Sequence, residues 1–134
     1  MKEMLCTAFA CMGAALSWAF GGWDAALAAL VICMAVDYAS GSIVALVFHN
    51  SSKTETGAYN STYGLMGLCK KCLMLLFVAV AVQMDQLIGS DYIRDAVCIG
   101  FCANEVLSIT ENLGLAGIPL PKVITKALEQ LQEK

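Results

Sequence analysis

The stretch AALAALVICMAVDYASGSIVALVF, residues 25–48, decides the class of fold. As a helix it is long enough to cross the roughly 30 Å hydrocarbon core of a bilayer, and Asp37 is its only charged residue. Of the 134 residues in the chain, 59% are apolar and only 14% are charged, and the mean hydropathy is +0.71. A water-soluble domain of this size cannot bury so much apolar surface. The composition therefore predicts an integral membrane protein.

Four apolar segments are candidates for membrane-spanning helices. The first has no charge, and we expect an uncleaved crossing there because its cleavage region is poor for a signal peptide. The fourth is the weakest candidate, since charged and polar residues interrupt it. Between the second and third, the polar residues 49–63 predict a solvated loop. The four candidate segments are residues 5–23, 25–48, 65–84 and 92–113.

The last part of the chain is expected to lie outside the hydrocarbon core. Glycines and prolines between residues 114 and 121 stop the preceding helix. The segment after them is too short and too charged to span, but five of its apolar residues share one helical face. We therefore predict an all-α integral membrane protein, a single domain over residues 1–134 with four transmembrane helices, or three, and a short amphipathic C-terminal helix. The shared face is formed by Val123, Ile124, Ala127, Leu128 and Leu131.

The distribution of charge favours four crossings over three. With four, all seven lysines fall on one side, and Arg94 is the one cation on the other side. Positive charge accumulates on the cytoplasmic side of membrane proteins, so we expect both termini in the cytoplasm. Lys70 and Lys71 then act as topology anchors at the membrane boundary, where long basic side chains reach the headgroups. The seven lysines are Lys2, Lys53, Lys70, Lys71, Lys122, Lys126 and Lys134.

Asp37 needs an explanation because it falls near the centre of the second span. A carboxylate there costs roughly 2.5–3.5 kcal/mol on insertion scales. Ser40 and Gly41 lie one turn away on the same face. Two interpretations stay open: a residue at a helix interface or an aqueous lumen, or a hydrogen-bonded structural acid between packed helices.

The fourth segment carries a polar stripe. At 100° per residue, its polar residues fall within about a third of the helix circumference. Several copies in a ring could use such a stripe to line a pore, or to form the seam between subunits. Alternatively, the stripe only packs against polar groups of neighbouring helices. The stripe comprises Arg94, Asn104, Glu105, Ser108, Glu111 and Asn112.

Other classes of function find no support in the sequence. No phosphate-binding glycine loop, zinc-binding HExxH motif or nucleophile elbow occurs, so we expect no enzyme, cofactor or metal site. The seven cysteines lie mostly in apolar segments, where cysteine behaves as a small hydrophobic residue. The net charge is −3 and no basic run exceeds two residues, which argues against nucleic-acid binding.

Several stretches together resemble one family. VDYASG (36–41), GLCKK (67–71), MDQLIG (84–89) and NEVLSITEN (104–112) occur in order, followed by Gly114, Gly117, Pro119 and Pro121. This pattern is similar to that of the bacteriophage holins of the toxin-secretion and phage-lysis type, over about residues 36–126. The family usually has a longer basic loop and tail, whereas Glu129 and Glu133 dilute the basic charge of this tail.

The resemblance implies a protein that accumulates in the bacterial cytoplasmic membrane and assembles with its own copies into large lesions. Through these an endolysin, or in some systems a toxin, leaves the cytoplasm. Two alternatives are an antiholin, which co-assembles with a holin and holds lysis back, and a small proton-coupled exporter. Such exporters typically carry their acid in the first helix, whereas the first span here is uncharged.

Overall fold

The computed structural model describes residues 1–133, apart from the side chains of Leu128, Leu131 and Gln132. Over these residues the regular structure is entirely helical, as predicted. Lys134, and the part of the predicted C-terminal apolar face formed by Leu128 and Leu131, lie outside the described residues. The helices are α1 (Lys2–Ala19), α2 (Ala25–Ile43), the π-helical turn η1 (Val44–Phe48), α3 (Ser61–Ile88), α4 (Ile93–Leu115) and α5 (Lys122–Gln132).

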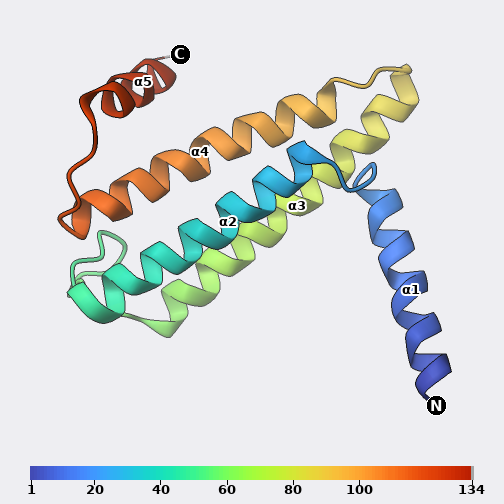
Figure 1. Ribbon diagram of the computed structural model, residues 1–134, viewed down its shortest axis with the longest axis horizontal. Coiled ribbons are helices and arrows are strands. Elements are labelled where there is room, and N and C mark those ends of the chain that lie inside the picture. Colours follow the sequence, from blue (N-terminus) through green and yellow to red (C-terminus); the bar gives the residue numbers. More distant parts are fainter. Residues whose placement is uncertain (134) are drawn as a thin grey trace.

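Helices α2, α3 and α4 lie side by side and form a three-helix bundle (Figure 1). Its apolar core consists of a cluster of buried residues in which three side chains have no exposed surface. In lipid such a core is held by close van der Waals packing, because lipid tails are as apolar as the side chains themselves. The three are Leu30 on α2, Val78 on α3 and Cys98 on α4.

Helix ends follow from local chemistry. Asp24 caps α2 by accepting a hydrogen bond from the Leu27 N–H at 3.0 Å. Asn60 caps α3 in the same way through the Thr62 N–H, at 2.9 Å. The predicted loop over residues 49–63 is therefore shorter than expected, since α3 begins at Ser61. The α3 helix ends at Gly89, whose φ of 68° suits a residue without a Cβ.

Helix α1 leaves the bundle. Gly21 and Gly22 have φ of 76° and 90°, so the chain turns sharply there, and α1 ends at Ala19 rather than continuing to residue 23. No residue of α1 is buried, and Figure 1 shows it pointing away from the other helices. At the opposite end of α4, α5 occupies the predicted C-terminal segment as a separate helix.

Within residues 1–133, two helical segments are long and apolar enough to cross a membrane by length and composition. They are Ala25–Phe48, which joins α2 and η1, and Ser61–Ile88, which is α3. The other two predicted spans are also helical, as α1 and α4. The number of crossings, four or three, remains a prediction.

Candidate functional site

A cluster of three charged side chains, here called the Lys71 cluster, lies in the interior of the bundle. It contains Asp37 from α2, Lys71 from α3 and Glu105 from α4. The Lys71 Nζ lies 2.7 Å from Asp37 Oδ2 and 2.5 Å from Glu105 Oε2. Only 12% of the Lys71 side chain is exposed, and 7% and 8% of its two partners. One ammonium therefore joins all three helices of the bundle.

Polar contacts extend this cluster along α2 and α4. The Asn112 amide Nδ2 donates to Ser40 Oγ at 2.9 Å, and lies 3.3 Å from both Oδ1 and the backbone oxygen of Asp37. Gly41 faces the same amide, because a Cβ at Gly41 would lie 3.5 Å from Asn112 Nδ2. Ser108 is half-buried on the same face of α4, between Glu105 and Asn112.

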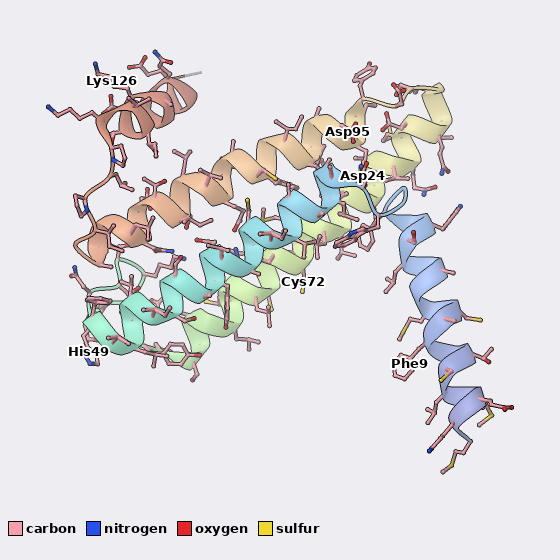
Figure 2. All side chains as sticks on the ribbon, in the orientation of Figure 1. Phe9, Asp24, His49, Cys72, Asp95 and Lys126 are labelled. Atoms are coloured by element: carbon pink, nitrogen blue, oxygen red, sulfur yellow. The ribbon has the colours of Figure 1, made fainter. Side chains whose placement is uncertain are left out.

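A second cluster, the Arg94 cluster, lies at the end of the bundle where α1 departs. The Arg94 guanidinium donates to Asp24 Oδ2 at 2.5 Å and to Asp95 Oδ1 at 3.0 Å. It also donates to the backbone oxygens of Phe20 and Gly22, at 3.1 and 3.0 Å. Figure 2 shows Asp24 and Asp95 at this end. Arg94 thus ties the turn after α1 to the start of α4.

Two carboxylates complete the Arg94 end. The hydrogen bond from Arg94 holds the pKa of the Asp24 carboxyl below its usual range, and the Leu27 N–H acts in the same direction. Asp85, at the end of α3, accepts from the backbone N–H groups of Ile93 and Arg94 at 3.0 and 2.9 Å. It thereby satisfies donors at the first turn of α4 that have no partner within the helix.

The structure brings most of the predicted site residues together, but not all. Asp37, Ser40, Gly41, Glu105, Ser108 and Asn112 gather around Lys71, whereas Arg94 belongs to the other cluster. Asn104 and Glu111 are exposed on α4. Of the two predicted topology anchors, Lys70 is exposed and Lys71 lies between the two buried acids.

Sequence reasoning missed the bridging position of Lys71 and the contacts of Asp24 and Asp85. One signal was available for Lys71. An acid within an apolar span requires a cation or a hydrogen-bond donor nearby. The apolar segments contain few cations, and Lys71 is one of them. Among the described residues, every buried side-chain nitrogen or oxygen has a hydrogen-bond partner. In this conformation Glu105 and Asn112 of the polar stripe of α4 are thus shielded by α2 and α3, whereas Asn104 and Glu111 are exposed.

The bundle pairs buried charged side chains across three helices and contains helices apolar enough to span a membrane, and these features together indicate a membrane protein. The chain belongs to the bacteriophage holin family, whose sequence model matches residues 14–133. The resemblance seen in the sequence is thereby confirmed. It is a family of non-enzymatic membrane proteins, and pore formation and host-cell lysis are its typical roles.

Several individual proteins are similar to this chain, and one of them is named as a holin. An uncharacterised protein of Clostridium acetobutylicum is 34% identical over 98% of this chain and 100% of its own length. An uncharacterised 14.9 kDa protein of Clostridium perfringens is 33% identical over 92% of this chain and 89% of its own. A Bacillus phage phi105 protein named "Probable holin" is 37% identical over 49% of this chain and 50% of its own. No solved structure matches the chain significantly.

Proposed function

We propose that this protein is a holin that oligomerises in the bacterial cytoplasmic membrane and opens large lesions. An endolysin, or a toxin, leaves the cell through them, and lysis of the host follows. The observation that carries the proposal is the Lys71 cluster, which joins helices α2, α3 and α4 in a chain of the holin family. Four crossings with both termini in the cytoplasm are the topology that we propose for it.

The buried position of Glu105 and Asn112 supports the proposal that separate copies tolerate lipid. Asp37 and Glu105 share the Lys71 ammonium, so no charge of this cluster faces acyl chains without a partner. Charged groups in hydrocarbon are strongly unfavourable unless they are paired or hydrated. A single copy therefore keeps the bilayer intact while the protein accumulates.

Assembly requires α4 to turn its stripe toward neighbouring copies or toward water. Asn104 and Glu111 are already exposed on α4 and are suited to make the first contacts between copies. When α4 moves away from α2 and α3, Glu105 and Asn112 exchange partners within the chain for water or for a second chain. Each polar group keeps a partner in both states, so the two states can differ by only a few kcal/mol, as bistable elements do.

Controlled expression tests the proposal in bacteria that hold an endolysin in the cytoplasm. We expect an abrupt loss of membrane potential, followed by complete release of the endolysin. An unchanged potential and a retained endolysin would contradict the proposal. Delay of lysis only when another holin is co-expressed would indicate an antiholin instead, and substrate-dependent proton flux without protein leakage would indicate an exporter.

A further inference from the structure

A cavity of about 200 Å³ lies at the end of the bundle opposite the Arg94 cluster. It is lined mainly by the last turns of α2, the start of α3 and the loop between them, and it is partly open. This is the end of the bundle at which Figure 2 labels His49. Asp37, Lys71 and Glu105 contribute to its lining, so the cavity reaches from the polar loop down to the Lys71 cluster.

The charge of the lining favours an anion. Lys53, Lys70 and Lys71 line the cavity, together with Asp37 and Glu105. Three lysines against two carboxylates leave one positive formal charge. Lys71 is already paired with both carboxylates, whereas no carboxylate of residues 1–133 lies within ion-pairing distance of Lys53 or Lys70. Lys53 in the loop and Lys70 on α3 are therefore the two cations of the cavity that have no carboxylate partner among these residues.

Neutral donors and open space accompany these cations. Ser42 and Tyr59 line the cavity, and their hydroxyls make no hydrogen bond with another described side chain or backbone group. Gly64 keeps room for the Tyr59 hydroxyl, since a Cβ at Gly64 would lie only 2.9 Å from it. Two ammonium groups and two hydroxyls around one space match the hydrogen-bonding demand of a phosphate oxyanion.

The cavity also lies where the chain changes from apolar to polar segments. The two segments apolar enough to span, Ala25–Phe48 and Ser61–Ile88, both begin or end at the polar loop beside it. Val47 and Leu65 are exposed by 66% and 62% on these segments, next to the cavity in sequence. A ligand held there would have its charged group among the lysines and its apolar part beside these side chains.

We propose that this cavity binds a phosphate anion, with the headgroup of an anionic phospholipid such as phosphatidylglycerol as its source in the membrane. The headgroup phosphodiester lies between Lys53 and Lys70, and the Ser42 and Tyr59 hydroxyls donate to its oxygens. Binding joins the polar loop to α3 and places a negative charge on the loop side of the Lys71 cluster. The proposal rests on insertion of α2 and α3 in a bilayer and is independent of pore formation.

The test measures how fast an amine-reactive reagent modifies each lysine of the full chain, by mass spectrometry. The chain is placed in nanodiscs of phosphatidylcholine, in nanodiscs of phosphatidylcholine with phosphatidylglycerol, and in phosphatidylcholine nanodiscs with inorganic phosphate at millimolar concentration. We expect phosphatidylglycerol to slow modification of Lys53 about fivefold relative to Lys122, the interaction strength of one lysine with anionic lipid. Lys122 reports the general effect of an anionic surface.

Charge-matched variants separate the cavity from the surface. Lys70→Gln removes one cation of the cavity and is expected to abolish the protection of Lys53, whereas Lys126→Gln on α5 leaves it unchanged. Equal protection by inorganic phosphate in phosphatidylcholine would assign the site to free phosphate rather than to lipid. The proposal is overturned if neither source protects Lys53 beyond Lys122, or if both variants behave alike. Permeabilisation is not measured, so failure here leaves the proposed function unaffected.

Discussion

The Lys71 cluster and the Arg94 cluster both pair charged side chains from different parts of the chain, but they lie at different places in the bundle. In the Lys71 cluster, one ammonium serves two buried carboxylates from two other helices. In the Arg94 cluster, the guanidinium is buried but Asp24 and Asp95 are about half exposed, at 50% and 51%. Water screens the second cluster more strongly than the first. Loss of a partner should therefore matter far more around Lys71, and the predictions below follow that order.

The largest effect is expected from Lys71→Met. This change leaves Asp37 and Glu105 buried in one space without their cation, and breaking a buried pair in this way destabilises by about 3–5 kcal/mol. Unfolding of the purified chain by denaturant in detergent micelles measures the loss. Lys71→Arg, which keeps the charge, and Lys70→Met, which removes an exposed lysine, serve as controls. Equal stability of Lys71→Met and Lys70→Met would show that the bridge contributes nothing.

A smaller effect on stability, but a clear one on function, is expected from Glu105→Leu. Asp37 still pairs with Lys71, so the loss is about that of one hydrogen bond to a charged group, roughly 1.5–3 kcal/mol. The variant also removes a charge from the stripe that we propose to face water after assembly. The onset of membrane depolarisation in induced cells should shift in time. Glu105→Gln, which keeps a polar side chain at the same position, is the matched control and should shift the timing less; identical lysis timing of wild type and Glu105→Leu would argue against a polar lining.

Asn112 is buried on α4 and Asn104 is exposed, so we expect their replacement to change the free energy of unfolding by different amounts. Asn112→Ala removes the amide that bridges Ser40 and Asp37, and loss of such a buried hydrogen-bonding group destabilises by about 1–2 kcal/mol. Asn104→Ala on the exposed side of α4 should leave the free energy of unfolding unchanged. Denaturation of both variants in the same detergent gives the comparison. A larger loss for Asn104→Ala would mean that the exposed side of α4 is the structural one.

The sequence was sufficient for the helices and for the polar face of α4, because both depend on periodicity and on runs of apolar residues along one chain. It was not sufficient for the partners of that face. Lys70 and Lys71 are adjacent and point about 100° apart on a helix, so they are not buried equally by the neighbouring helices. Which of the two is buried more depends on the rotation of α3 against α2 and α4. That rotation is set by packing between segments that are distant in sequence, such as those that contain Asp37 and Lys71.

The smallest effect, and a pH-dependent one, is expected at Asp24. Its pKa is lowered in the folded chain, chiefly by the hydrogen bond from Arg94, so the pair contributes stability above the unfolded pKa of about 3.9. That contribution is lost as the pH falls through the lower folded value. Asp24→Asn keeps an N-cap for α2 but removes the charge, and should destabilise by about 0.2–1 kcal/mol at neutral pH, as for a half-exposed pair. Denaturation at neutral and acidic pH tests this: the difference from wild type should vanish in acid, whereas a difference that persists there would mean that capping, not the Arg94 pair, holds this end of the bundle.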